Sequence, residues 1–352
     1  MALIPTINFV HAKEITSLTR IGTVAVLSFG LSMLLTPVYT KLAFKYKWWK
    51  QARTNSSTSG EATPIVHQLQ AAKHQRPFPT MAGIITIVTV LIITLLLNLS
   101  RSQTWLPLFA FTCAGLVGLL DDYINVRGSN NLAGGLRANI KLWLILGVAM
   151  IGGFYFYFKL GYHLIHVPAV GDFSIGWLYI PLFVFVVVAT ANAVNITDGL
   201  DGLAGGLLTT AFGVYAVIAY FQQSYGLAGF CATIVGAMLT YTWFNIFPAR
   251  FLMGDSGAFA LGTALGVVAM LTNTVFVLPI IAGVFVIEAG SSVLQIASKK
   301  ILHRKIFLSA PLHHHLEAIG WPETKVTMRL WVVGQVFGAV GLILALIGNK
   351  ML

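Results

Sequence analysis

The segment 177-WLYIPLFVFVVVATANAVNITDGLDGLAGGLLTTAFGVYAVIAYF-221 decides the fold of this protein. It holds two apolar stretches, 177–194 and 203–221, and the few residues between them include Asp198 and Asp201. A helix needs about 20 predominantly apolar residues to cross a bilayer, and both stretches are near that length. The segment therefore predicts two consecutive membrane helices joined by a short acidic turn.

The rest of the chain continues this pattern. Hydrophobic residues make up 57% of the 352 residues and charged residues 9%, with a mean hydropathy of +0.82, whereas a soluble domain carries about 25% charged residues. We predict an all-α polytopic membrane protein, a single domain over residues 1–352 without internal repeats. Its ten expected transmembrane helices cover approximately residues 18–40, 80–98, 105–120, 140–158, 177–194, 203–221, 226–244, 257–272, 274–297 and 329–348.

The basic residues indicate how these helices are oriented. Lys and Arg number 22 against 11 Asp and Glu, and 17 of the 22 fall in loops on one side of the expected membrane. Because Lys and Arg collect on the cytoplasmic side, both termini are expected outside. The net charge of +11 suits an anionic membrane surface or substrate. Nucleic acid is discounted, because the basic residues lie in short loops between apolar segments. The longest cytoplasmic loop, 41–79, contains a polar stretch at 54–60 that we expect to be flexible.

Five of the eleven acidic residues lie at cytoplasmic ends of the expected helices: Asp121, Asp122, Asp198, Asp201 and Asp255. A charge at a membrane edge is costly and usually has a functional reason, so these residues are candidates for an active site. Asp121 and Asp122 end the third expected helix. Adjacent carboxylates repel each other unless a cation or proton intervenes. A solvated helix end is the structural alternative.

The other two acidic motifs are rich in glycine. In 195-NITDGLDGLAGG-206, Asp198 and Asp201 are three residues apart and share a face of a helical turn. The glycines allow a ligand or phosphate to approach closely, and helix packing through small residues is the alternative. Asp255 lies just before the eighth expected helix. A carboxylate with water and phosphate oxygens is an ordinary Mg²⁺ shell, and an N-cap is the alternative or an additional role.

Further polar residues have interpretations that stay open. Glu288, in the middle of the ninth expected helix, is either hydrogen-bonded in the bundle or part of a lipid groove. His313, His314 and His315 are consecutive, and because adjacent side chains diverge, a zinc site is disfavoured. Phosphate binding, proton donation or bracing of the loop fits them better. Lys141 opens the fourth expected helix, where it either extends to the interface or contacts a phosphate.

Three motifs together resemble those of a known enzyme family. They are NAVNITDGLDGL at 192–203, MGD at 253–255 and APLHHHLE at 310–317. From about residue 20 to its end, the sequence resembles the phospho-N-acetylmuramoyl-pentapeptide transferases. These belong to the polyprenyl-phosphate N-acetylhexosamine-1-phosphate transferase superfamily. The triple histidine and the NAVN segment are specific to these enzymes, whereas MGD is shared across the superfamily.

The resemblance implies an activity and a set of site residues. Enzymes of this family transfer phospho-MurNAc-pentapeptide from UDP-MurNAc-pentapeptide to undecaprenyl phosphate, giving lipid I and UMP in the first membrane step of peptidoglycan synthesis. They require Mg²⁺ and span the bacterial inner membrane ten times, with both termini outside and the active site on the cytoplasmic face. A homodimer is also suggested. The resemblance implies catalytic roles for Asp121, Asp122, Asp198, Asp255 and His314, with Asp255 as the metal ligand. It implies substrate contacts for Lys141, Asn195, Asp201, His313, His315 and Phe251.

The sequence departs from the family at several positions. The family has Phe directly before MGD, where this chain has Leu252, and Phe251 is one place early for a ring that stacks on uracil. The usual GTPTMGG reads 77-PFPTMAG-83. Ser256 is more typical of relatives that transfer GlcNAc-1-phosphate.

These assignments lead to a mechanistic hypothesis. Phosphoryl transfer between two anions needs charge neutralisation and alignment. Asp255 would hold Mg²⁺ on the diphosphate with help from Asp122. Asp121 would take a proton from the lipid phosphate, which then attacks the β-phosphate. Asn195 and Asp198 would orient the nucleoside or diphosphate. A two-step route through a covalently modified aspartate is the alternative.

Two other functions stay open from the sequence. One is a transferase of the same superfamily that uses UDP-GlcNAc or another UDP-HexNAc, against which the triple histidine argues. The other is an ion-coupled transporter. Transporters place ionisable residues near the bilayer midplane, where Glu288 alone of the eleven acids is expected.

Overall fold

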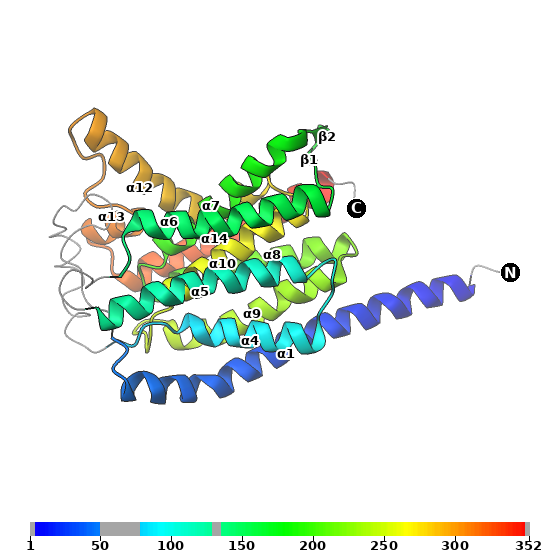
Figure 1. Ribbon diagram of the computed structural model, residues 1–352, viewed down its shortest axis with the longest axis horizontal. Coiled ribbons are helices and arrows are strands. Elements are labelled where there is room, and N and C mark those ends of the chain that lie inside the picture. The colour runs from blue at the N-terminus through cyan, green and yellow to red at the C-terminus, as the bar shows by residue number, and fades with distance from the viewer. Residues whose placement is uncertain (1–3, 50–77, 129–134, 349–352) are drawn as a thin grey trace.

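The computed structural model describes residues 4–49, 78–128 and 135–348, and the polar stretch at 54–60 lies outside them. The described part of the chain is mostly helical (Figure 1). Its long helices are α1 (Ile4–Lys45), α4 (Gly83–Leu97), α5 (Trp105–Arg127), α6 (Ala138–Phe154), α7 (Tyr179–Thr197), α8 (Leu203–Phe221), α9 (Tyr225–Asn245), α10 (Gly254–Leu271), α12 (Gly283–Ile301) and α14 (Glu323–Gly348). The short ones are η2 (Tyr155–Lys159), η3 (Gly176–Leu178), α11 (Leu278–Ile281) and α13 (Leu312–Ala318).

Helix α10 lies in the interior of this bundle. All of its residues except Leu271 are buried, and it packs chiefly against α5 and α7. Small residues make this possible, since a Cβ added at Gly262 would lie 2.7 Å from Cα of Ala191 in α7. Glycine at such contacts lets helix backbones approach closely in a membrane bundle. The helix that carries Asp255 is thus enclosed by its neighbours.

The predicted membrane helices are largely confirmed. Eight helical segments in the described residues are long and apolar enough to cross a membrane, and α4, with 15 residues, is apolar but shorter. Two boundaries were wrong in a way that matters for the acids. Helix α5 continues past Asp121 and Asp122 to Arg127, and α10 begins at Gly254, so Asp255 lies inside its first turn.

The prediction of one continuous helix over 274–297 was wrong. The segment consists of α11 and α12, separated at Ala282, whose φ of −95° and ψ of 27° depart from helical values. Pro279 stands in the first turn of α11, where the missing N–H of proline costs nothing. At the start of α12, Gly283 packs against the ring of Phe337 in α14, where a Cβ would lie 2.6 Å from the ring. The break redirects α12, which leans away from the bundle in Figure 1.

Between Glu288 and Ser298, helix α12 has a buried polar face and an exposed apolar face. Glu288, Ser291, Gln295 and Ser298 are buried and recur at helical spacing, whereas Val293, Leu294 and Ile301 are exposed. In water this arrangement would be unstable, but an exposed apolar face suits hydrocarbon. The buried polar face is therefore available to bind other parts of the chain.

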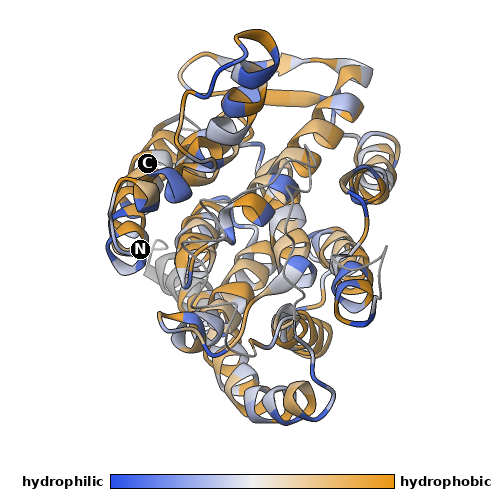
Figure 2. Ribbon diagram, turned by 90° about the vertical axis from the view of Figure 1, so that its left-hand side faces the viewer, coloured by the Kyte–Doolittle hydropathy of each residue, from blue (hydrophilic) through white to orange (hydrophobic). Residues whose placement is uncertain are grey.

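A small hairpin that the sequence analysis did not predict joins α6 to α7. Strands β1 (Leu164–Val167) and β2 (Gly171–Ser174) pair antiparallel. His166 fastens the hairpin to α14, since its Nε2 lies 3.0 Å from the carbonyl oxygen of Gly348. The hairpin and the start of α1 lie at one end of the bundle, and α13 lies at the other (Figure 1). Figure 2 looks onto that other end, along helices in which hydrophobic residues predominate.

Candidate active site

Asp121, Asp122 and Asp255 form one cluster where the last turns of α5 meet the first turn of α10. One carboxylate oxygen from each lies within 4.8 Å of the other two. The three residues are only 3%, 2% and 8% exposed, respectively. Ionised carboxylates that are close together and buried repel one another strongly unless positive charge is present. The packing of α5 on α10 therefore gathers acids from separate motifs into one place that calls for a cation.

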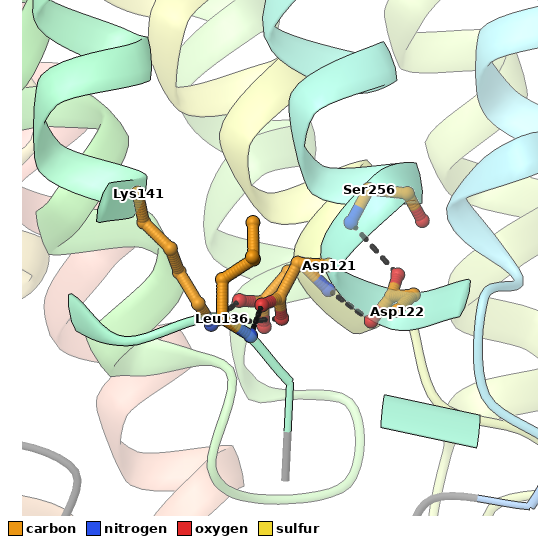
Figure 3. A network of polar contacts seen from close by, with 6 residues as sticks. Asp121, Asp122, Leu136, Lys141 and Ser256 are labelled. Atoms are coloured by element: carbon orange, nitrogen blue, oxygen red, sulfur yellow. Dashed lines mark hydrogen bonds and ion pairs between the residues drawn. The ribbon is translucent and has the colours of Figure 1, made fainter. Parts of the chain in front are cut away.

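Lys141, in the first turn of α6, supplies a positive charge to this cluster (Figure 3). Its Nζ lies 2.8 Å from Oδ2 of Asp121 and 2.5 Å from Oδ2 of Asp255. The ammonium therefore joins α6 to both other helices. Three ionised carboxylates with one ammonium carry a formal charge of two minus, which suits a divalent cation with oxygen ligands.

Asp122 uses both of its oxygens to hold the start of α10. Its Oδ1 accepts the N–H of Asp255 at 3.0 Å, and its Oδ2 accepts the N–H of Ser256 at 2.9 Å (Figure 3). The first N–H groups of a helix have no partner within it, and the helix N-terminus favours negative charge. Asp122 thus caps α10 from a neighbouring helix. The capping role considered for Asp255 belongs to Asp122, which also fixes the position of Asp255.

Two glycines allow these contacts. Gly118 in α5 lies against the start of α10, where a Cβ would overlap the backbone of Asp255. Gly254 has a φ of +76°, which favours glycine, and a Cβ there would lie 2.5 Å from Oδ2 of Asp122. A side chain at either position would push Asp122 and Asp255 apart.

The backbone before α6 contributes a further donor to Asp121. The N–H of Leu136 donates to Oδ1 of Asp121 at 2.6 Å. Gly135 precedes it with a φ of +83°. With Lys141 on Oδ2, both oxygens of Asp121 have a donor. Leu136 is a site residue that sequence reasoning missed, because a backbone donor leaves no signal in residue type.

The second acidic motif forms the turn between α7 and α8, and Asp201 holds it in place. Oδ2 of Asp201 accepts the N–H of Ala249 at 3.0 Å, and its own N–H donates to Oε1 of Glu323 at 2.7 Å. Asp201 thereby ties the turn to the segment before α10 and to the start of α14. Asn195 and Asp198, at the end of α7 and its C-cap, are half-buried. Packing of the helices through glycine would not require an acid in this turn, whereas these hydrogen bonds do require Asp201.

Each of the three histidines faces a different partner. Nδ1 of His313 lies 2.9 Å from Oε2 of Glu288 in α12, and Nδ1 of His314 lies 2.8 Å from Oε2 of Glu317. His315 accepts the N–H of Leu308 at 3.2 Å. The rings of His313 and His314 contact each other, with centroids 4.2 Å apart, while their Nδ1 atoms face different carboxylates. No metal-binding cluster that includes the histidines is found among residues 4–49, 78–128 and 135–348. Of the two interpretations of Glu288, the hydrogen-bonded one is correct.

His314 is the member of the three with a perturbed protonation equilibrium. Burial lowers the pKa of His314, although the hydrogen bond and charge of Glu317 act in the opposite direction. Desolvation disfavours the charged imidazolium. His314 is therefore held toward its neutral form, with Nδ1 directed at a carboxylate.

Phe251 lies in the core beside the site. It is 1% exposed and packs against Tyr39, with ring centroids 5.4 Å apart and planes at 80°, and against Phe244 and Tyr241. Aromatic contacts of this kind stabilise a core. Stacking of uracil on Phe251 stays a prediction, and it would require this aromatic cluster to open.

Comparison with known proteins identifies the family. A family model described as glycosyl transferase family 4 matches residues 104–273. A relative from Chloroflexus aurantiacus, named phospho-N-acetylmuramoyl-pentapeptide-transferase, is 36% identical over 97% of this chain and 93% of its own length. Relatives of the same name from Geobacillus sp. (strain WCH70) and Geobacillus thermodenitrificans are 39% and 37% identical, over 90% of this chain and 95% and 94% of their own lengths. The chain belongs to the phospho-N-acetylmuramoyl-pentapeptide transferase family.

The region matched by the family model contains the carboxylate cluster. Residues 104–273 extend from just before α5 to just after α10, so they include the three clustered carboxylates, Lys141 and the Asp198 turn. The histidines of α13 lie beyond that region. His313 contacts Glu288 of α12, and the position of Glu288 in the middle of an apolar helix was the sequence signal that it has a buried partner.

Proposed function

We propose that this protein transfers phospho-MurNAc-pentapeptide from UDP-MurNAc-pentapeptide to undecaprenyl phosphate, giving lipid I and UMP. A bond forms between an oxygen of the lipid phosphate and the β-phosphorus of the donor. The bond from that phosphorus to the oxygen shared with the α-phosphate breaks, and UMP leaves with that oxygen. The observation that carries the proposal is the carboxylate cluster with Lys141, in a membrane chain that shares 36–39% identity with enzymes of this name.

The donor set of this cluster fits Mg²⁺. Hard oxygen ligands from one or two carboxylates, completed by water and phosphate oxygens, are what Mg²⁺ takes in proteins. Asp255 is the ligand we favour, with Asp121 beside it, because both oxygens of Asp122 already accept N–H groups of α10. Bound there, Mg²⁺ would neutralise charge on the diphosphate.

The remaining residues of the cluster would act on the phosphates. Lys141, which joins Asp121 and Asp255, would contact a phosphate oxygen of the substrate. Asp121 would take the proton when the lipid phosphate carries one, and for that it must exchange its contact with Lys141. Positioning and charge stabilisation supply most of the rate in phosphoryl transfer, so a fixed, buried cluster is suited to the reaction.

The turn and the histidines would bind the donor. Asn195 and Asp198 are half-buried at the end of α7 and would orient the nucleoside or diphosphate. Asp201 would act by holding their turn, since its contacts to Ala249 and Glu323 occupy it. His314 would contact a phosphate or transfer a proton, and His315 would brace the loop before α13 through Leu308.

We propose ten crossings, with both termini outside and the site on the cytoplasmic face. The two crossings beyond the eight long segments would be α4 and the α11–α12 pair. The face follows from the basic residues: Lys45, Arg127 and Lys141 stand at the end of the bundle that carries the acids, and such residues collect on the cytoplasmic side. A single domain over residues 1–352 and a homodimer in the inner membrane complete the proposal.

The sugar of the donor is the part that an experiment must fix. Ser256, which favoured a UDP-GlcNAc donor in the sequence, is fully buried, and its hydroxyl packs near Gly83 of α4. It therefore supplies no sugar contact that would support the rival. The structure gives the transporter interpretation no support either, because Glu288 is sealed against His313.

The test is release of UMP by purified protein with undecaprenyl phosphate and Mg²⁺. UMP should form with UDP-MurNAc-pentapeptide and not with UDP-GlcNAc, and the product should be lipid I by mass spectrometry. UMP release with UDP-GlcNAc instead would replace this donor by the rival one. Substrate flux into liposomes without UMP release would favour a transporter.

A further inference from the structure

Glu288 and His313 form a buried pair between α12 and α13. Both are fully buried. Oε2 of Glu288 lies 2.9 Å from Nδ1 of His313 and also accepts the backbone N–H of His313 at 3.2 Å. One carboxylate oxygen thus fixes both the ring and the backbone at the start of α13. The contact fixes the side-chain rotamer of His313.

This contact also decides which ring nitrogen carries a proton. A carboxylate opposite Nδ1 keeps the proton on that nitrogen, as in other carboxylate–histidine pairs. Nε2 is then the atom that remains to act, as an acceptor in the neutral ring or as a donor in the imidazolium.

Two atoms of this pair lack a hydrogen-bond partner among the described residues: Nε2 of His313 and Oε1 of Glu288. Buried polar atoms without a partner are rare in folded proteins and costly. Nε2 of His313 is therefore a candidate for a hydrogen bond to a bound substrate.

Nε2 is directed at the turn that carries Asp198. A Cβ added at Gly199 would overlap Nε2 of His313, so the ring can lie here because residue 199 is glycine. Gly199 is half-buried and follows the C-cap of α7. The nearest backbone beside Nε2 is thus a glycine turn without a side chain of its own.

We propose that Glu288 is a positioning residue of this enzyme, which holds His313 so that Nε2 binds a phosphate oxygen of a substrate beside the Asp198–Gly199 turn. The proposal rests on the proposed function, since it names a residue that serves the same reaction. The phosphate belongs either to the nucleotide donor or to the polyprenyl phosphate. Glu288 itself touches neither substrate and acts through His313.

The first test is a double-mutant cycle in the UMP-release assay with full-length protein. Glu288→Gln keeps the size and an acceptor oxygen but removes the charge, and it should lower kcat roughly 10- to 100-fold, the scale of a lost hydrogen bond to a charged group. KM for the nucleotide donor should change less than kcat. In a His313→Ala background, Glu288→Gln should have no further effect, because Glu288 acts through that ring.

Ser291→Ala is the matched control. Ser291 is buried on the same face of α12, one turn beyond Glu288, and its hydroxyl bonds to the carbonyl oxygen of Glu288. It should retain wild-type kcat. A kcat for Glu288→Gln within twofold of wild type overturns the proposal. So do effects that multiply in the double variant, because they place Glu288 and His313 in separate roles.

The second test follows His313 directly by ¹⁵N solid-state NMR of histidine-labelled protein in lipid, with His313→Ala used to assign the signal. Nδ1 should be protonated, and the Nε2 signal should shift when UDP or a short-chain polyprenyl phosphate is added. The ligand that produces the shift identifies the source of the phosphate, and a shift with neither overturns the contact. This test does not depend on turnover. If wild-type protein releases no UMP from UDP-MurNAc-pentapeptide, the proposed function fails while the assignment of Glu288 and His313 is still decided.

Discussion

The carboxylate cluster around Asp255 and the histidine pairs of α13 differ in the partners that their buried carboxylates have. In the cluster, the ammonium of Lys141 contacts Asp121 and Asp255, and Asp122 lies beside them on the backbone N–H groups of α10. In the pairs, each carboxylate faces one imidazole, Glu288 with His313 and Glu317 with His314. The cluster gathers three carboxylates and could hold a cation, whereas each carboxylate of the pairs has one imidazole of the chain as its partner. The difference separates a cluster that could hold a metal ion from a region in which carboxylates orient imidazole rings.

The two regions also differ in what holds them. The cluster is fixed by backbone N–H groups of Leu136, Asp255 and Ser256, and these cannot be removed by changing a side chain. The pairs depend on side chains: Glu288 comes from α12, which leans out of the bundle, and Glu317 lies on α13 itself. Substitutions should therefore affect metal binding in the first region and ring orientation in the second, and the predictions below test that separation.

Asp255→Asn should have the largest effect. The variant loses one of the negative charges that attract the metal while keeping the shape of the side chain. We expect kcat for UMP release to fall by roughly 1,000-fold, as charge stabilisation in phosphoryl transfer is lost. Binding of Mn²⁺, measured by electron paramagnetic resonance as a probe for Mg²⁺, should weaken in parallel.

The control is Asp172→Asn, in the hairpin at the opposite end of the bundle. Asp172 is a largely exposed acid that pairs with His166. It should leave turnover and Mn²⁺ binding unchanged. Near-normal turnover of Asp255→Asn would remove the metal assignment from this cluster.

Asp122→Asn should have the second-largest effect on kcat, and unlike Asp255→Asn it should also lower stability. An amide has one acceptor oxygen, so the N–H of either Asp255 or Ser256 would lose its partner and face an NH₂ group. We expect the free energy of unfolding to fall by about 1–3 kcal/mol and kcat to fall by roughly 100-fold, because Asp255 is no longer held.

Thermal denaturation in detergent measures the first effect and UMP release the second. The comparison with Asp255→Asn is the informative one, since Asp255→Asn removes no acceptor of an α10 N–H group and should melt near the wild-type temperature. Equal stability of Asp122→Asn and wild type would show that Asp122 does not cap α10.

Lys141→Met should separate metal binding from turnover. Removal of the ammonium leaves Asp121 and Asp255 without this partner, so the cluster becomes more negative and should bind Mn²⁺ several-fold more tightly. The phosphate contact is lost at the same time, and kcat should fall by roughly 10- to 100-fold.

Titration with Mn²⁺ and the UMP assay on one preparation test both parts. Lys159→Met, at the end of η2 away from the site, is the control and should change neither. Weaker Mn²⁺ binding in Lys141→Met would mean that Lys141 organises the carboxylates rather than competing with the metal.

The sequence predicted the helices well because hydropathy is a sum over residues. It also selected Asp121, Asp122 and Asp255 and Lys141, since charges at membrane edges are conspicuous. It did not predict the break at Ala282, because the hydropathy of 274–287 is continuous. Pro279 and Gly283 disfavour a helix interior, but the position of the break depends on contacts such as Gly283 with Phe337. Composition alone does not report such tertiary contacts.

The roles within the site were harder to predict than its members. Asp122 and Asp255 look alike in sequence, and their difference arises from the packing of α5 on α10, which directs Asp122 to backbone N–H groups. Glu288 was noticed from its place in an apolar segment, but its partner is 25 residues away, beyond the break in regular structure that follows α12. Long-range pairing of this kind depends on the fold.

Substitution of His314 should give the smallest effect, and it tests the histidine pairs of α13. Burial lowers the pKa of His314 in the folded protein below its unfolded value of about 6.5. As the pH falls below that value, the unfolded chain takes up a proton that the folded chain resists. His314 therefore contributes stability that is present above about pH 6.5 and is lost as the pH falls toward its folded pKa.

His314→Gln should remove this part of the pH dependence, so between pH 7.5 and 5.5 the wild type should lose on the order of 1–2 °C more in Tm than the variant. His163→Gln, at an exposed position near the hairpin, should behave as wild type. The same loss of Tm in His314→Gln and wild type would show that the charge and hydrogen bond of Glu317 cancel the effect of burial at this ring.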